Sequence, residues 1–166
     1  MNISTSKNTL AILKGDRVTL RPWKQRDVPF FMALRNDIPT QTALMARPKP
    51  NTTQQVIQWL MRHSDDDNIR FFVIASHDHD AACGFIELRD INTIDRWANL
   101  GICLTPSVRG QGLGREALAI LEIYAKTEIN LRKIVLHVIS SNHTAIGLYE
   151  KTGYKTVGVH SDHHYA

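Results

Sequence analysis

The sequence predicts one mixed α/β domain with a mostly antiparallel sheet. Three apolar, β-branched runs separated by short polar turns follow one another between residues 70 and 104, which is typical of consecutive antiparallel strands. The apolar period then changes from two to about 3.6 residues, and a further strand pattern follows over 133–139. A strand, a helix and a second strand in that order indicate one parallel crossover. With 166 residues, 43% of them apolar, residues 1–166 are expected to fold as a single domain.

The N-terminal third is predicted to contain an arm, a strand and two helices. Residues 1–14 begin rich in Ser, Asn and Lys and are expected to form a flexible arm. The alternating pattern over 17–21 is typical of a strand. A helix is expected over about 27–35, with its first residue, an Asp, as N-cap. Thr52 and Gln55 form a capping-box pattern at the start of a second helix.

The remaining elements follow from apolar periodicity and turn residues. They are strands over 70–75, 81–91 and 97–104, a helix over about 113–125, a strand over 133–139, a helix over about 144–151 and a last strand over 154–159. Gly153 is a typical left-handed stop for the last helix.

A glycine-rich segment over 106–115 leads directly into the long helix. Its glycines let the main chain approach an anion without a Cβ clash. The first N–H groups of the helix have no internal partner and lie at the positive end of its dipole, so the segment suits a pyrophosphate. Arg115 stands where a Walker A loop has Lys, and also where a dinucleotide fingerprint has its third glycine, so both of those interpretations are weak.

Composition restricts the partners. The net charge is +4, no run of four or more Lys or Arg occurs, and the aromatic signature of RNA-binding domains is absent, so no nucleic-acid partner is expected. No leader pattern and no run of 18 apolar residues occurs, so no membrane partner is expected and a cytoplasmic location is the default. Cys83 and Cys103 are expected to be buried free thiols. His160, His163 and His164 lack further ligands for zinc, so no metal site is expected.

Two motifs make the chain resemble the GNAT superfamily of N-acetyltransferases, which bind acetyl-CoA. The first hallmark, Arg/Gln-x-x-Gly-x-Gly/Ala at the start of the central helix, is matched by Arg109, Gly112 and Gly114. The second, Asn-x-x-Ala-x-x-Leu/Phe-Tyr-x-x-x-Gly-Phe/Tyr, is matched by Asn142, Ala145, Leu148, Tyr149, Gly153 and Tyr154. The layout is most similar to the branch with ribosomal-protein, spermidine and amino-sugar acetyltransferases.

The resemblance implies the GNAT fold and acetyl-CoA as co-substrate. The family's fourth and fifth strands, here 97–104 and 133–139, splay apart, helped by a bulge in the fourth, and the pantetheine arm pairs with the fourth like an added strand. Asn142 resembles the family's side-chain contact to that arm and also fits a helix N-cap, and the two roles are compatible. The residues predicted to bind acetyl-CoA are Cys103, Leu104, Thr105, Arg109, Gly110, Gln111, Gly112, Leu113, Gly114, Arg115, Asn142 and Tyr149.

Tyr149 and Glu87 are the predicted catalytic residues. A phenol such as that of Tyr149 can donate its proton to the departing CoA thiolate; the alternative is a tyrosine that only packs in the core. The amine arrives protonated and needs a base, yet Asn99 stands where many relatives carry Glu on the fourth strand. Glu87 on the third strand, or Asp90 after it, is expected to act through water instead, and a water relay without a single base is the other possibility.

The predicted reaction is direct transfer of an acetyl group to a primary amine in a ternary complex. Nothing beside Cys103 indicates a lowered pKa, so an acyl-enzyme is disfavoured. The acceptor is a small-molecule amine, an amino sugar or a protein α-amine. Segment 40–53 carries two cations and no acid, which argues mildly against polycations. The rival function is a non-catalytic acyl-CoA sensor.

Relatives complete the sheet with a strand that returns between the fifth and sixth strands. Here the sequence ends at Ala166, where that return would begin. The final strand is therefore expected to be missing, and either a homo-oligomer such as a dimer completes the sheet or its edge stays open.

Overall fold

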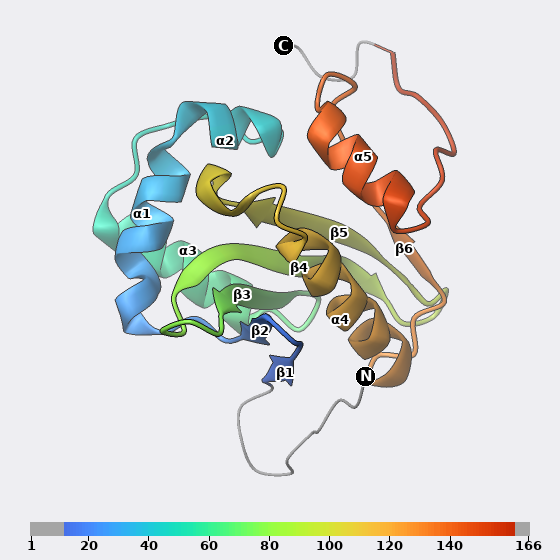
Figure 1. Cartoon of the computed structure of the whole chain (residues 1–166), viewed down its shortest axis with the longest axis horizontal. Coiled ribbons are helices and arrows are strands. Elements are labelled where there is room, and N and C mark those ends of the chain that lie inside the picture. The colour runs from blue at the N-terminus through green and yellow to red at the C-terminus, as the bar shows by residue number, and fades with distance from the viewer. Residues whose placement is uncertain (1–11, 162–166) are drawn as a thin grey trace.

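The computed structural model describes residues 12–161, and Figure 1 shows their arrangement around one sheet. Six strands lie in the order β1-β2-β3-β4-β5-β6, antiparallel throughout except for the parallel β5–β6 pair. The strands are β1 (Leu13–Lys14), β2 (Val18–Arg21), β3 (Arg70–Ser76), β4 (Ala82–Asn92), β5 (Trp97–Leu104) and β6 (Lys133–Val135). The helices are α1 (Val28–Asn36), α2 (Ile38–Ala43), α3 (Thr53–Asp65), α4 (Leu113–Thr127) and α5 (His143–Lys151). The predicted mixed, mostly antiparallel sheet is confirmed.

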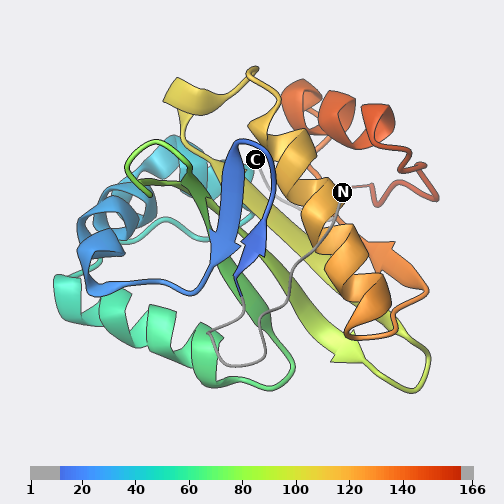
Figure 2. The same ribbon diagram turned by 60° about the horizontal axis from the view of Figure 1, so that its bottom comes forward.

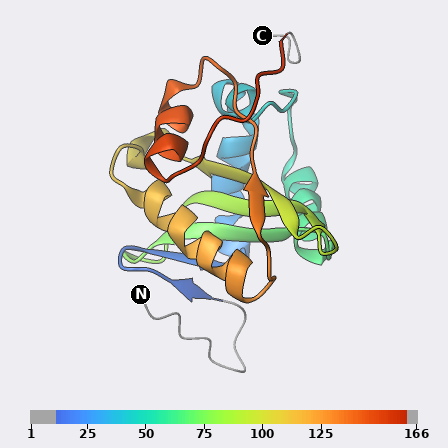
Figure 3. The same ribbon diagram turned by 90° about the vertical axis from the view of Figure 1, so that its right-hand side faces the viewer.

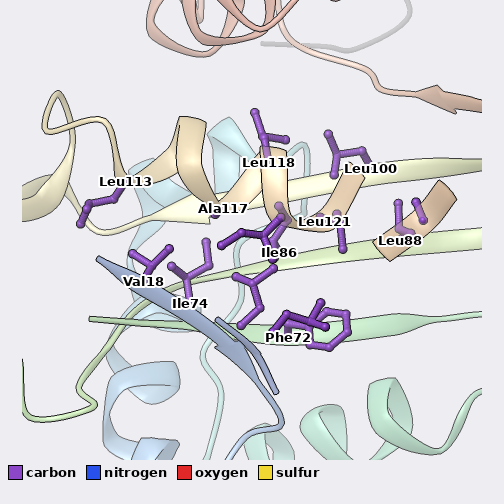
Figure 4. Packing of buried hydrophobic residues seen from close by; sticks show 14 of the residues in the cluster. Val18, Phe72, Ile74, Ile86, Leu88, Leu100, Leu113, Ala117, Leu118 and Leu121 are labelled. Atoms are coloured by element: carbon purple, nitrogen blue, oxygen red, sulfur yellow. The ribbon is translucent and has the colours of Figure 1, made fainter. Parts of the chain in front are cut away.

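The sheet separates two apolar clusters, one on each face. Alternating residues of β4 point to opposite faces, as the strand period requires. Ile86 packs with Leu118 and Leu121 of α4 on one face, as Figure 4 shows. Phe85 packs with Phe31 of α1 on the other face, together with residues of α3. The helices therefore cover both faces, and a side chain's position along a strand decides which cluster it joins.

The helix starts confirm one predicted cap and correct another. At α3, the Thr52 hydroxyl accepts from the N–H of Gln55 at 3.3 Å, and the Gln55 side chain accepts from the N–H of Thr52 at 2.8 Å. Asp27 does not cap α1, because its carboxylate accepts from the N–H of Lys24 and from the buried guanidinium of Arg21. Helix α2, which the sequence analysis missed, begins after Asp37 as an N-cap.

The flexible arm predicted over 1–14 is wrong at its last two residues, which belong to a strand. Leu13 and Lys14 pair with Leu20 and Thr19 as strand β1, and Leu13 is fully buried. The stretch 1–11 lies outside the described residues.

Strands β5 and β6 diverge, as predicted. They pair only between 97–99 and 133–135, although β5 continues to Leu104. Figure 3 shows β6 running at a steep angle to β5. The predicted bulge within 97–104 is wrong, because the irregularity lies in β4, where Asp90 and Ile91 both fall opposite Ala98. Strand β6 also ends earlier than the predicted 133–139, since the diverging segment has no ladder partner among the described residues.

The predicted strand over 154–159 is also wrong. In the described part of the chain, residues 154–160 form no strand, and Val157 is 92% exposed. A cleft of about 630 Å³ is lined by the end of α4, by Ile134 of β6 and by Tyr154, the first residue of this segment. The cleft lies between the elements where the resemblance places the final strand, and a strand pattern without a neighbour cannot form a ladder.

A buried ion-pair network joins β2, the start of α1 and the β3–β4 hairpin. Arg21 is 1% exposed and donates to both carboxylate oxygens of Asp27, at 2.7 and 3.0 Å, and to Asp80 at 2.7 Å. Arg26, which is half exposed, also pairs with Asp80. Lys24, also half exposed, pairs with Asp80 at 2.7 Å, so the network joins one buried and two solvated cations to the same hairpin.

We predict that Arg21→Met destabilises the protein by about 3–5 kcal/mol, because it leaves the buried Asp27 carboxylate without its cation. Arg26→Gln serves as the control and should cost less than about 1 kcal/mol, since exposed pairs contribute little. Urea unfolding of both variants measures the difference. Equal losses in the two variants would show that the buried pair does not hold these elements together.

Candidate active site

The glycine loop enters α4 through two left-handed residues. Gly110 and Gly112 have φ of +75° and +83°, a backbone conformation that favours glycine, so these positions suit glycine for a reason other than the predicted approach to an anion. Gly114 is needed for space, because a Cβ there would lie 3.1 Å from Leu104 and 3.3 Å from Leu148. The loop thus brings the first N–H groups of α4 close to the end of β5 and to α5, as an anion-binding loop requires.

A residue that the sequence analysis missed holds this loop. Arg17 donates to the carbonyl of Gln111 at 2.8 Å and pairs with Glu116 at 3.2 Å. The Glu116 carboxylate also accepts from the N–H groups of Arg17 and Val18, so it ties the β1–β2 hairpin to α4, and Figure 2 shows the two side by side. Because the C=O and N–H of a planar trans peptide point in opposite directions, the N–H of Gly112 is aimed away from Arg17.

Glu87 is a buried carboxylate with one oxygen lacking a hydrogen bond. Its side chain is 7% exposed; Oε1 lies 3.2 Å from Arg89 Nε, and Oε2 lies 3.8 Å from His63 Nε2 without a hydrogen bond. Burial raises the pKa of Glu87 to about 7, against the lowering effect of Arg89. Glu87 lies opposite Gly101 on β5, where a Cβ would come within 3.2 Å of Oε1. This carboxylate can therefore exchange a proton near neutral pH.

His63 and an aromatic cluster surround Glu87 on the α3 face. The Nδ1 atom of His63 lies 2.8 Å from the carbonyl of Trp59, so Nδ1 carries the hydrogen and Nε2, facing Glu87, is the acceptor nitrogen of the neutral ring. Burial lowers the pKa of His63, and nearby guanidinium groups lower it further. The alternative base, Asp90, is exposed and accepts from the side chain of Asn99 at 2.8 Å. Glu87 is thus the carboxylate in the less polar surroundings.

Helix α5 brings two predicted residues to the other side of β5. Burial raises the pKa of Tyr149 to about 12, and the proximity of Cys103 adds to the shift, so the phenol stays protonated at neutral pH. Burial likewise raises the pKa of Cys103 to about 11. Asn142 caps α5 by accepting from the N–H of Ala145 at 3.2 Å, which confirms the N-cap role.

At the end of β5, the main-chain N–H and C=O groups of successive residues point alternately toward β4 and toward the gap between β5 and β6. The N–H of Thr105 bonds the carbonyl of Cys83 on β4 at 3.0 Å, and strand alternation turns the main-chain groups of Cys103 the same way. The main-chain groups of Ile102 and Leu104 point into the gap between β5 and β6, where the Leu104 carbonyl accepts from Arg109 at 2.9 Å. The predicted main-chain contacts at Cys103 and Thr105 are thus corrected, because these groups face β4.

The absence of metal ligation and of membrane insertion are two further expectations from the sequence. Within residues 12–161 no group of three or more His, Cys, Asp or Glu is arranged to hold a metal ion. His163 and His164 lie outside the described residues. Over the same range no helix combines the length and apolarity that a membrane span requires.

Comparisons with known proteins agree with this arrangement. Residues 17–155 match the family model for an acetyltransferase (GNAT) domain. The chain is 30% identical over 144 residues to a spermidine N(1)-acetyltransferase of Vibrio cholerae, covering 87% of this chain and 82% of that one. It is 29% identical over 141 residues to the enzyme of the same name from Escherichia coli, covering 85% and 74% of the two chains.

Solved structures are also similar. The Vibrio cholerae spermidine N-acetyltransferase in complex with CoA and spermine gives a TM-score of 0.74 at 30% identity, over 82% of this chain and 79% of that one. A GNAT-family acetyltransferase from Bacillus anthracis, 16% identical, gives 0.77 over 89% and 86% of the two chains, which is a likeness of fold alone.

The fold and the loop thus define an acetyltransferase that uses acetyl-CoA as co-substrate. The chain belongs to the GNAT acetyltransferase family, and it is an N-acetyltransferase.

We predict a pH-dependent stability that originates at Glu87. Its pKa rises from 4.5 to about 7 on folding, so between these values the folded protein binds more protons than the unfolded chain. Stability from this group is present below the lower value and is lost as pH rises through the upper one, by about 3 kcal/mol. Urea unfolding at pH 4.5 and pH 8 should show this loss in the wild type and not in Glu87→Gln. Parallel stability profiles for the two proteins would contradict it.

Proposed function

We propose that this protein transfers the acetyl group of acetyl-CoA directly to a primary amine, with both substrates bound at once. The observation that carries the proposal is the placement of Glu87 and Tyr149 at the same strand, β5, from different elements. Glu87 lies beside Gly101, and Tyr149 lies near Cys103. An amine that meets the thioester here would have a base on one side and a proton donor on the other.

For the co-substrate, we propose that the N–H groups of residues 110–115 hold the pyrophosphate. The extended pantetheine would run along the open edge of β5, where the N–H of Leu104 and the main-chain groups of Ile102 face the gap. The Nδ2 group of Asn142, which has no hydrogen-bond partner among the described residues, would donate to an amide carbonyl of that arm. Capping by Oδ1 and contact through Nδ2 use different atoms, so both roles fit one side chain.

For the acceptor, Glu87 would take the proton that the ammonium group loses, through a water molecule. The neutral amine would form the new C–N bond at the thioester carbonyl, and the C–S bond would then break. The Tyr149 hydroxyl would donate its hydrogen to the departing sulfur, and a main-chain N–H of β5 would stabilise the oxyanion. The proton that the nitrogen loses on becoming an amide would return to the Tyr149 phenolate. Cys103 is unsuited to carry the acetyl group, because its raised pKa leaves almost no thiolate at neutral pH.

Thiol release from acetyl-CoA tests this proposal. The wild type should release thiol with at least one primary amine in a panel of small amines, amino sugars and peptides. Tyr149→Phe should lower kcat about tenfold to a thousandfold with little change in the Kd of acetyl-CoA, since the lost hydroxyl acts on the leaving group. Binding of acetyl-CoA without release across the panel would favour a sensor, and an unchanged kcat would remove Tyr149 from the mechanism.

Arg17 is proposed as a positioning residue of the pyrophosphate loop. Arg17→Gln frees the Gln111 carbonyl, so the N–H of Gly112 is no longer aimed at the ligand, and the KM of acetyl-CoA should rise about tenfold with kcat nearly unchanged. S-acetylpantetheine, which lacks the diphosphate, should react equally well with variant and wild type.

Two control variants distinguish the effect of Arg17 on the orientation of the loop from the effect of its positive charge. Arg132→Gln removes the same charge from a residue that bonds Asp95 instead of the loop, and it should leave both donors unaffected. Arg17→Lys keeps the charge without the guanidinium geometry, so its KM for acetyl-CoA should stay close to that of Arg17→Gln. A loss of equal size with both donors would refute the positioning role.

We also propose a cytoplasmic location and self-association, as further properties of the working enzyme. Two buried free thiols, Cys83 and Cys103, suit a reducing compartment. The cleft beside β6 offers an open edge that a second copy would extend.

A further inference from the structure

Arg35 is a partly buried cation without a counter-ion. It lies on α1 with its guanidinium carbon 4.6 Å from the centre of the Trp59 ring. Its Nε is buried without a hydrogen bond, and no carboxylate among the described residues pairs with it. Buried guanidinium groups are normally paired, because desolvation of an unpaired charge is costly. In Arg35 this cost falls on the shielded Nε, and an anion beside the guanidinium would offset it.

The position of Arg35 connects it to the acceptor side. The Trp59 ring contacts the His63 ring at a tilt of 46°, with ring centres 4.4 Å apart, and His63 faces Glu87. A row of side chains from α1 and α3 thus leads from Arg35 to the proposed base. The row also lies in a positive electrostatic environment. Arg62 on α3 lowers the pKa values of Arg35 and His63, and Arg89 on β4 lowers that of His63.

Three acids near this row are already engaged. Asp37 caps α2 through the N–H of Thr40, Asp90 accepts from Asn99, and Glu87 lies beside Arg89. A second ammonium group on an acceptor would find guanidinium groups and no unengaged carboxylate among these three. An anion on the acceptor would find Arg35, whose planar fork of N–H donors matches carboxylate and phosphate oxygens.

We propose that Arg35 binds an anionic oxygen, a carboxylate or a phosphate, carried by the acceptor amine. The acceptor class is then an amine with an anionic group at its far end, in contrast to the polyamines named for the similar enzymes. This inference rests on the proposed function, since it assigns the substrate of the same site.

Matched amines test the inference. Butylamine, γ-aminobutyrate and putrescine present one amine with a neutral, anionic or cationic far end, and aminopropyl phosphate presents a phosphate. The wild type should use one of the two anionic amines with a kcat/KM about tenfold or more above butylamine, and putrescine least well. The better anion identifies carboxylate or phosphate as the natural group.

Variants assign the preference to Arg35. Arg35→Met keeps an apolar stem over Trp59 and should abolish the preference for the anion, so that the kcat/KM values for the anionic amine and for butylamine become equal within the variant. Arg35→Lys should retain part of the preference for the anionic amine. The control Lys126→Gln, which removes an exposed charge from the far end of α4, should retain the whole preference. A wild type that prefers putrescine, or an anion preference that survives Arg35→Met, overturns the inference and leaves the acetyl transfer intact.

Calorimetry separates failure of the inference from failure of the proposed function. Aminopropyl phosphate and γ-aminobutyrate are titrated into the CoA-bound protein and into its Arg35→Met variant. If no amine releases thiol but one of these ligands binds the wild type and not the variant, the anion site stands and the transfer reaction is wrong. If neither ligand binds the wild type and no amine reacts, both proposals are wrong.

Discussion

The divergence of β5 from β6 is the constraint on which the site depends. Hydrogen bonding between these strands stops at Asn99 and Val135, and β5 continues to Leu104. Over that length, main-chain groups of alternate β5 residues face a gap instead of a neighbouring strand, so an extended ligand with amides can take the neighbour's place. The start of α4 and the body of α5 flank the same gap, which places the glycine loop and the Tyr149 phenol along one path.

The sheet also determines why Glu87 can differ chemically from an ordinary surface carboxylate. Register puts it opposite Gly101, and the missing side chain of that glycine leaves room for a carboxyl group against the strand. Aromatic side chains from α3 and the sheet exclude water there, and the facing Nε2 of His63, 3.8 Å away, gives the second oxygen no hydrogen bond. Burial therefore outweighs the attraction of Arg89, and the group holds its proton to higher pH.

Local patterns predicted most of the fold, and long-range contacts explain the rest. The strands between 70 and 104, the capping box at Thr52 and the glycine loop depend on neighbouring residues, and all were predicted. The segment 154–159 has a strand pattern, but a strand requires a partner, which no local signal reveals. Arg17, His63 and Arg35 act across distant parts of the chain; Arg17, for example, bonds a carbonyl 94 positions away. No motif marks such residues, so they became visible only in the folded structure.

The two hallmark motifs lie beside the gap proposed for the cofactor, and this explains why they say little about the acceptor. They shape the loop before α4 and the helix α5, which any amine acetyltransferase of this fold needs. The proposed acceptor site lies on α1, α3 and the opposite face of β4, where the charges of Arg35 and Arg62 belong to no hallmark. Electrostatic complementarity there favours some partners and rejects others at a cost of several kcal/mol. Relatives with the same fold and motifs therefore share the reaction, whereas the choice of substrate depends on side chains outside the motifs.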